Sequence, residues 1–386
     1  MHTLSSPPSE IRLPVITRRR RWCPGTRVLV GLAVVWLGFA VAQWLLSGHW
    51  WFWLLVDVMP PFALLAVPAL LILSVLTLPL CRVRLPASAR LWVVTAAALA
   101  GLLGFDQSGV NLAALTGNPD GPAPVGALHV FVWNTQYWDQ TDNPDRFYAF
   151  LTAQHADVYL LQEYLNWDDS KDDQGALQVL DGARLRHEFP GYTVVARGEL
   201  LTLSRYPVVA QPPVGPDRSI AGTAVDWPTV FETAKVLRTD LAIHGRVVSF
   251  YNVHIPVHLD ASRGVFHSGF YDYTRQANAQ RQAQFTGLSD DVAANPHPTV
   301  VAGDFNTTPA MGDMDRLRGM MRDAIRADPS LYPVSWQSGG WMRFWRLDWT
   351  FTARGVRVHD YAFRDAEGMS DHRPQQMVVS LPGSSR

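Results

Sequence analysis

The chain has 386 residues, which is long for a single domain, and its overall charge of −1 hides a strong asymmetry. The part up to Gly126 carries nine arginines, no lysine and four acidic residues, whereas the part from Ala127 onward carries 24 basic and 30 acidic residues. The two parts therefore face different surroundings. Both cysteines, Cys23 and Cys81, lie in the first part, which excludes a disulfide within the second part. We expect no disulfide-linked partner.

Residues 28–115 are predicted to form a transmembrane region. Residues 28–47 contain no charge, and twenty helical residues span about 30 Å, the thickness of a bilayer's hydrocarbon core. A second uncharged segment covers 58–80, and a third, 91–105, is short. We expect all three to span, with an interfacial helix as the alternative for the third. A cleaved signal peptide is disfavoured because the first apolar run is too long and another follows.

Arginines indicate how these segments are oriented. They occur at Arg18–Arg21, Arg27, Arg82, Arg84 and Arg90, and the loop between the first and second segments has none. The positive-inside rule places the basic tail, residues 1–27, in the cytoplasm. Three spans then place the rest of a multi-pass cell-membrane protein outside the cytoplasm, whereas two spans would place it inside. Residues 116–126 are rich in Pro and Gly and are predicted to form a short linker.

Residues 127–386 are predicted to form an α/β domain with sheets inside and helices outside. Predicted strands are 129–133, 158–162, 193–196, 200–204, 247–253, 299–302 and 347–352. Predicted helices are 144–154, 175–189, 273–288 and 314–327. The mixture of both element types over about 260 residues is enough for one large core.

Polar side chains recur where predicted strands end, so that a rigid sheet can bring them to one edge. These residues are Asn134 and Gln136 after HVFVW, Glu163 after VYLLQ, His254 after FYNV, Asp304 and Asn306 after TVVAG, Asp348 within RLDWTF, and Asp371 and His372 within SDHRP. Each residue alone is more often a turn former, a cap or a surface group. Their joint order along one chain is what indicates a catalytic site.

These residue types suit hydrolysis of a phosphate ester. Mg²⁺ prefers a few carboxylates plus water, and Glu163 and Asp371 can supply them. Amides such as Asn134 and Asn306 can hold phosphate oxygens or metal-bound water without adding negative charge. The metal is expected to be Mg²⁺, with Mn²⁺ or Ca²⁺ as alternatives.

The remaining groups suit proton transfer. Asp304 is the candidate to orient or deprotonate the attacking water. His372 with Asp348 would form a histidine fixed in one tautomer, able to act as an acid or a base. His254 could donate to the scissile phosphate.

The ordered segments WNTQ, LLQEY, LSRYP, NVHIP, GDFNTTP, RLDWTF and SDHRP resemble the endonuclease/exonuclease/phosphatase superfamily, the deoxyribonuclease-I-like group. The resemblance covers about residues 127–382 and none of the membrane region. It implies a four-layer α/β sandwich, in which two packed mixed β-sheets are flanked by helices.

The resemblance also implies roles for individual residues. Glu163 would bind the divalent cation, with Asn134 and Asp371 nearby, and Asp304 would orient or deprotonate water. Asn306 would position the phosphate, and His254 and His372 would stabilise developing charge or protonate the leaving group, with Asp348 aligning His372. Gln136 stands where some members carry an acid, so no second metal ligand is expected there. Because every other expected position is filled, an active enzyme is predicted.

The sequence favours a lipid or cell-envelope phosphate as substrate over DNA. The acidic domain has only two lysines, whereas duplex binding rests largely on neutralising phosphates. A local basic groove stays open as an alternative, and Gln136, Arg205 and Arg281 are the candidate substrate-binding residues. The short linker keeps the domain close to the bilayer.

Two aromatic segments, 255–273 and 336–345, could border the site. They would dip into headgroups or stack on a base, unless they pack on the sheets. The alternatives to a lipid or envelope phosphoesterase are an extracytoplasmic nuclease and a non-catalytic binding or scaffold protein. The sequence gives no indication of oligomeric state.

Overall fold

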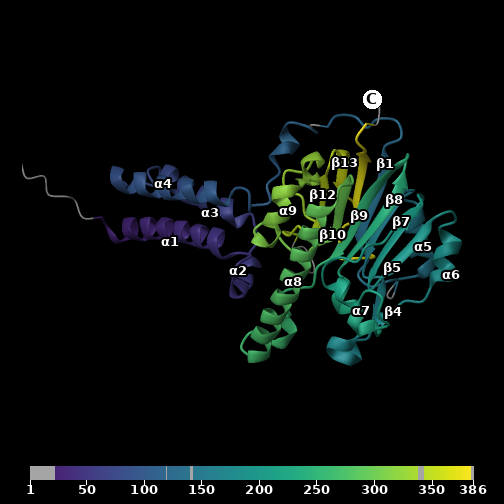
Figure 1. The fold of residues 1–386 in the computed structure, drawn as a ribbon. Helices are drawn as coiled ribbons and strands as arrows, with labels where there is room; N and C mark the ends of the chain where they lie inside the picture. Colours follow the sequence, from purple (N-terminus) through teal and green to yellow (C-terminus); the bar gives the residue numbers. More distant parts are fainter. Residues whose placement is uncertain (1–21, 119, 140–141, 338–342, 384–386) are drawn as a thin grey trace, which may run out of the picture.

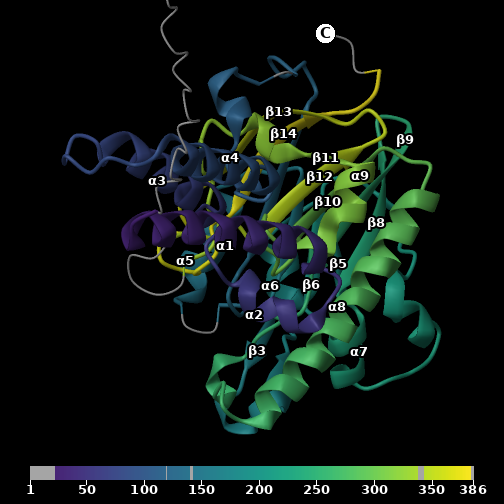
Figure 2. The ribbon, with the colours of Figure 1, turned by 90° about the vertical axis from the view of Figure 1, so that its left-hand side faces the viewer.

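A computed structural model describes residues 22–118, 120–139, 142–337 and 343–383 (Figure 1). The chain forms an α/β body with a helical arm projecting from one side (Figures 1 and 2). The arm consists of α1 (Pro24–Leu46), α3 (Ala63–Thr77) and α4 (Ala87–Gly104). Two short helices, η1 (Trp51–Trp53) and α2 (Leu54–Asp57), connect α1 to α3 at the end of the arm next to the body. Most of the predicted basic tail lies outside the described residues.

The helices of the arm carry their apolar side chains on the outside. Two of them, α1 and α4, are long and apolar enough to cross a membrane. Only 17% of the apolar stretch of α1 is buried, and Val35 and Leu102 are 70% and 75% exposed. A buried helix of a soluble core does not expose such side chains. By length, composition and exposure, α1 and α4 are therefore candidate membrane spans.

The middle helix of the arm is shorter than the predicted span of residues 58–80. Helix α3 has only 15 residues. Pro60 and Pro61 precede its start, and its regular hydrogen bonding ends at Thr77. Turns extend it at both ends, since the amide of Ala63 donates to Pro60 and that of Arg82 to Pro79. Helix α4 begins four residues before the predicted start of the third span, directly after Pro86.

The body contains two six-stranded mixed sheets. The first has the order β13 (Arg357–Phe363), β14 (Gln375–Ser380), β1 (Leu128–Asn134), β2 (Val158–Gln162), β6 (Leu200–Ser204), β5 (Thr193–Arg197). The second has the order β11 (Arg322–Asp323), β12 (Asp348–Ala353), β10 (Thr299–Asp304), β9 (Arg246–His254), β8 (Val236–Ile243), β7 (Val208–Ala210). A small hairpin pairs β3 (Leu165–Trp167) with β4 (Ala176–Gln178).

Helices cover the outer faces of both sheets. The α-helices of the body are α5 (Pro144–Thr152), α6 (Gly182–Glu188), α7 (Trp227–Thr233), α8 (Ser268–Ala294) and α9 (Asp315–Met320). The remaining short helices are η2 (Leu112–Leu115), η3 (Asp169–Gln174), η4 (Gly215–Ile220), η5 (Ala261–Arg263), η6 (Gly312–Met314) and η7 (Ala324–Ala327). In Figure 1, α5 and α6 lie on one side of the sheets and α8 and α9 on the other.

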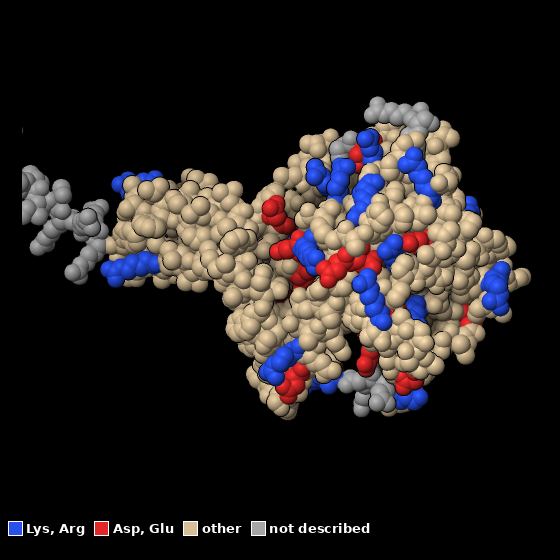
Figure 3. Space-filling model, in the orientation of Figure 1, with Lys and Arg blue, Asp and Glu red and all other residues tan. Residues whose placement is uncertain are grey.

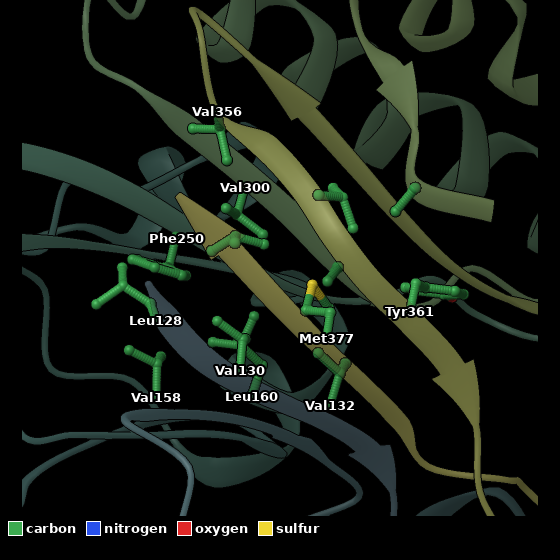
Figure 4. Packing of buried hydrophobic residues seen from close by; sticks show 14 of the residues in the cluster. Leu128, Val130, Val132, Val158, Leu160, Phe250, Val300, Val356, Tyr361 and Met377 are labelled. Atoms are coloured by element: carbon green, nitrogen blue, oxygen red, sulfur yellow. The ribbon is translucent and has the colours of Figure 1, made fainter. Parts of the chain in front are cut away.

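The alternation of side chains along β1 builds two of the hydrophobic layers. Val130 and Val132 point between the sheets, into a core that includes Phe250 and Val300 (Figure 4). The residues of β1 that alternate with these valines, such as Trp133, pack on the opposite face of the sheet against α5. A third cluster lies between the second sheet and α8. Burying each large apolar side chain contributes about 1.5–3 kcal/mol. This arrangement confirms the predicted four-layer sandwich.

Two predicted helices are wrong in part. Residues 175–189 form strand β4 before the short helix α6, and residues 314–327 divide into α9, β11 and η7. Pairing of β4 with β3 and of β11 with β12 replaces the helical hydrogen bonds there. The periodicity of the side chains in these segments did not reveal these partners, which lie elsewhere in the chain.

The arm is docked on the body by buried polar groups rather than tethered to it. The Gln43 side-chain amide donates to Asp57 Oδ1 at 2.7 Å and to the carbonyl oxygen of Ala310 at 2.9 Å. The Ser47 hydroxyl donates to Asp57 and accepts from the amide of Gly312 at 3.0 Å. A Cβ on Gly312 would lie 2.4 Å from the carbonyl oxygen of Ser47, so the two backbones touch.

The predicted linker and the segment just before it are also held on the body. The side-chain amide of Asn118 donates to the carbonyl oxygens of Val358 and His359, and that of Asn111 donates to three carbonyl oxygens between Ile325 and Ser330. The arm therefore has two attachments to the body, one before and one after its last two helices. The domain boundaries stay a prediction.

Replacing Asp57 with asparagine is expected to stabilise the docked arm at neutral and alkaline pH. Burial raises the pKa of Asp57 from 3.8 to about 7, although Gln43 and Ser47 oppose the shift. A carboxyl with a raised pKa loses its contribution to stability as the pH rises toward the folded-state pKa. The gain from D57N should be small near pH 4 and reach about 1–3 kcal/mol at pH 8.

The measurement is the melting temperature of the full chain in detergent between pH 4 and pH 8. Glu232→Gln, a change at an exposed position, serves as the control. A D57N variant that melts below the wild type at pH 8 would contradict the expectation.

Candidate active site

Two pairs of parallel strands deliver the polar side chains to one edge of the body. Strand β1 is parallel to β2 and strand β9 is parallel to β10, so their carboxyl ends coincide. Asn134 stands opposite Gln162 in the first sheet, and Asp304 stands opposite His254 in the second. Because the sheets pack face to face, these strand ends meet, and residues predicted from separate motifs lie in contact.

Asn134 lies at the centre of the cluster. Its side-chain amide donates to Glu163 Oε1 and to Asp304 Oδ2, both at 3.0 Å. Its own side-chain oxygen accepts from the amide of Gln136. Asn134 therefore links a carboxylate of the first sheet to one of the second.

Glu163 sits in a strained turn directly after β2. Its φ of +59° lies in the left-handed region, which costs of order 1–3 kcal/mol for a residue with a side chain. The amide of Tyr137 donates to its second carboxylate oxygen at 3.0 Å, and burial raises the pKa of Glu163. The surrounding structure thus holds a carboxylate in a position where it needs positive charge.

Asp304 and Asn306 occupy the tight turn after β10. The amide of Asn306 donates to Asp304 Oδ1 at 2.8 Å. The side-chain amide of Asn306 donates to the carbonyl oxygen of Ile255 at 2.9 Å, which joins the turn to the segment after β9. Asp304 is 1% exposed. The turn therefore holds Asp304 rigidly, with Oδ2 facing the rest of the cluster.

Two histidines lie close to this oxygen. The Nε2 atoms of His254 and His372 lie 3.7 and 3.6 Å from Asp304 Oδ2. His372 Nδ1 lies 2.8 Å from Asp348 Oδ2, so the predicted His372–Asp348 pair is present in the geometry. Burial opposes protonation of His372, but Asp348 and Asp304 raise its pKa well above the usual value.

His254 has a carboxylate partner of its own, which the sequence analysis missed. Glu199 Oε2 lies 3.1 Å from His254 Nδ1, and Glu199 also pairs with Lys235. Although burial opposes both shifts, the pKa of Glu199 is lowered to about 2 and that of His254 is raised to about 9, because the charges of the pair favour each other. The only feature of the sequence that could have indicated Glu199 is its position directly before the apolar strand LLTLS.

The remaining predicted residues divide into two groups. Asp371 and Gln136 lie at the rim, where the amide of Asp371 donates to Gln136 Oε1 at 2.8 Å and the indole of Trp336 donates to Asp371 Oδ2. Arg205 and Arg281 are not brought to the site. Arg205 contacts Asp157 at the opposite end of β2, and Arg281 is fully buried against Thr307 and Asp313.

The two aromatic segments have mixed environments. Phe270 is buried and Tyr271 stacks on Phe52 of the arm, whereas Phe266 is 97% exposed. Trp336 and Trp345 border the cavity at the cluster. Trp341 lies outside the described residues.

A cavity of about 460 Å³ opens over the cluster. Residues that line it include Gln136, Glu163, Asp304, Asn306, Asp371 and His372. The catalytic candidates therefore face a space that is large enough for a phosphate ester with part of its leaving group.

The donor set fits a divalent cation. Five carboxylates gather here, from Glu163, Glu199, Asp304, Asp348 and Asp371, and Lys235 is the only Lys or Arg bonded to them among the described residues. Asp304, Asp348 and His372 also bring ligand atoms within 4.8 Å of one another. Since Asp348 is already paired with His372, Glu163, which is half-buried and lines the cavity, is the better candidate for the primary ligand.

Comparison with family models places residues 131–372 in the endonuclease/exonuclease/phosphatase family. This match spans the strand ends just described and most of the chain. The chain belongs to the endonuclease/exonuclease/phosphatase family. Its members hydrolyse phosphate esters and depend on divalent metals, so the protein is assigned to the phosphoric ester hydrolases.

Several solved structures are similar to the body at low sequence identity. An endonuclease/exonuclease/phosphatase from Beutenbergia cavernae is 18% identical, with a TM-score of 0.46, covering 67% of this chain and 72% of the other. Truncated Caenorhabditis elegans TDP2 is 17% identical, with a TM-score of 0.45, covering 67% and 100%. A Neisseria 3′ phosphatase bound to a product DNA hairpin is 17% identical, with a TM-score of 0.44, covering 66% and 100%. No curated protein matches the chain.

Replacing Glu199 with glutamine is expected to move the alkaline limb of the pH–activity profile. The carboxylate of Glu199 raises the pKa of His254 to about 9, so its loss should let His254 deprotonate about 1–2 pH units lower. The measurement is kcat/KM between pH 6 and pH 10 for the full chain. Glu188→Gln, on α6, is the control. An alkaline limb that stays in place would show that protonated His254 is not required.

Proposed function

We propose that the protein is a membrane-anchored, divalent-metal-dependent phosphoesterase that hydrolyses a lipid or cell-envelope phosphate outside the cytoplasm. The observation that carries this proposal is the position of the cavity. One of the residues that line it, Val58, belongs to the segment that connects α2 to α3 of the arm. A site whose wall includes the base of an apolar arm works at the membrane surface.

The charges of the arm support the proposed orientation. Arg27, Arg82, Arg84 and Arg90 lie at the amino end of α1, in the α3–α4 connection and in the first turn of α4. All of these positions are at the end of the arm remote from the body, where Figure 3 shows Lys and Arg on an otherwise uncharged visible surface. With the basic end in the cytoplasm, the body lies outside.

The native cysteines give a test of this topology. Cys23 and Cys81 are exposed and lie at the basic end of the arm. An impermeant maleimide should label them only after the cells are permeabilised, and a reporter fused after Arg386 should be active only outside the cytoplasm. Labelling of intact cells together with an inactive reporter would reverse the orientation.

The proposed chemistry is attack of water on phosphorus. Glu163, with Asn134 and Asp371 nearby, would hold a Mg²⁺ ion, which would neutralise charge on the phosphoryl oxygens. Asp304 orients the water and takes its proton, since its Oδ2 faces the cavity between both histidines. Protonated His254 and His372 stabilise the charge that develops and donate to the leaving group. Asn306 holds a phosphate oxygen.

Activity of the full chain in detergent or nanodiscs with Mg²⁺ tests the proposal. Matched samples contain phospholipid vesicles, inositol phosphates or plasmid DNA, and His372→Ala is the inactive control. Release of phosphate or headgroup from lipid, with intact DNA, is expected. Rapid DNA cleavage with untouched lipid would identify a surface nuclease. A protein that hydrolyses none of them and keeps its biological role as H372A would be a binding or scaffold protein.

A further inference from the structure

Two kinds of residue line the cavity over the catalytic cluster. Charged and amide groups belong to the cluster itself. The apolar and aromatic residues are Val58, Val257, Leu259, Trp336, Trp345 and Leu347, which we call the apolar wall. Val58 and Val257 are 44% and 46% exposed, so two aliphatic side chains face open space beside a charged site. Such exposed apolar surface marks a place where another apolar group binds.

The apolar wall is continuous with the base of the arm. The indole of Trp345 donates to the carbonyl oxygen of Val58 at 3.1 Å, which fixes the wall to the arm. Phe344, next to Trp345, packs on Phe62, whose ring lies 5.4 Å away and directly precedes α3. A hydrocarbon chain that leaves the cavity along the wall therefore reaches the apolar surface of the arm.

The same wall is poorly suited to a nucleotide chain. None of the described residues that line the cavity is a lysine or an arginine, so phosphates beyond the scissile one would lack a partner. Trp336 and Trp345 pack edge to face, 5.8 Å apart, and their indole N–H groups are used by Asp371 and Val58. These contacts hold both rings in fixed positions at the wall.

From these observations we infer that the apolar wall binds the hydrocarbon chain of the substrate and thereby selects membrane lipids with a phosphoester headgroup. The inference rests on the proposed function. The headgroup phosphate lies at Asp304 and Glu163, while the chain passes Val257 and Val58 toward the bilayer. The arm thus forms part of the substrate-binding site as well as the anchor.

The test compares two substrates with the same phosphomonoester in the full chain. Dioctanoyl phosphatidic acid carries hydrocarbon chains, and glycerol 3-phosphate carries none. Val257→Ser and Leu259→Ser are expected to lower the ratio of kcat/KM for the lipid to kcat/KM for glycerol 3-phosphate by about tenfold. Val209→Ser is the matched control, because Val209 is 54% exposed on the edge strand β7 and leaves the cavity unchanged.

The outcomes separate the inference from the function on which it rests. A ratio that stays at the wild-type value in both variants, while their melting temperatures and lipid hydrolysis persist, overturns the inference alone. Hydrolysis of plasmid DNA, with neither phosphomonoester attacked, overturns the proposed function as well. A lowered ratio in V257S and L259S, but not in V209S, supports both.

Discussion

Replacing Glu163 with glutamine is expected to reduce kcat by roughly 10³-fold, because the variant loses the carboxylate that would hold the cation. Glutamine keeps the shape of the side chain, although its single carbonyl oxygen can accept only one of the two hydrogen bonds that Asn134 and Tyr137 donate to the carboxylate. The change therefore removes charge with little change in packing. Because the folded protein favours a proton on Glu163, E163Q should be as stable as the wild type without metal, or more so.

Mg²⁺ distinguishes the loss of a ligand from a general defect. The melting temperature of the wild type should rise with Mg²⁺ concentration, since a ligand that binds only the folded state stabilises it. This rise should be strongly reduced in E163Q, and EDTA should abolish wild-type activity. Glu188→Gln is the matched control, because Glu188 pairs with Arg184 on the surface helix α6. Wild-type kcat in E163Q would rule out Glu163 as the primary ligand.

The strand-end residues were predictable because local sequence determines them. An apolar run that ends in polar residues places those residues at the rim of a sheet, and strands 158–162 and 200–204 have the same bounds in the structure as in the sequence analysis. The order of the motifs then predicted which strand ends belong together. The local pattern predicted an α/β domain, and the resemblance of the ordered motifs to the superfamily implied the four-layer sandwich that the packing of the two sheets confirms.

Glu199 and Lys235 could not be predicted in this way. Glu199 stands in the turn between β5 and β6 of the first sheet, and Lys235 directly precedes β8 of the second. They meet at His254 only because the two sheets pack face to face. The local pattern of apolar and polar residues does not indicate which positions of the two sheets come into contact. The docking of the arm has the same cause, since 267 residues separate Gln43 from the carbonyl of Ala310 to which it donates.

Arg205 and Arg281 show the opposite error. Both were selected as substrate-binding candidates by charge alone, in a domain with a net negative charge. In the structure, Arg281 makes its contacts inside the body, where it donates to the carbonyl oxygen of Pro256 and so supports the segment after His254. A buried arginine of this kind is paired with neighbouring polar groups, and it supports the site without lining the cavity. Composition therefore predicted the sign of the domain's charge but not which cations reach the cavity.

Replacing Gly303 with alanine is expected to destabilise the body by about 3 kcal/mol or more and to lower kcat/KM by at least roughly 10²-fold. Gly303 has a φ of +146°, and a Cβ there would lie 2.0 Å from the carbonyl oxygen of Val253. Strands β9 and β10 would have to separate at the position just before His254 and Asp304. The 3.7 Å distance between His254 Nε2 and Asp304 Oδ2 depends on that close approach.

Gly319→Ala provides the matched control for this prediction. Gly319 lies in α9, and a Cβ there meets no atom within 4 Å, so alanine should leave activity unchanged and raise helix stability by up to about 1 kcal/mol. The measurements are the melting temperature and kcat/KM of the full chain. A G303A variant with the stability and activity of the wild type would mean that the two strands tolerate a wider spacing. The expected joint loss would instead show that one backbone contact sets both the packing of the second sheet and the geometry of its two catalytic groups.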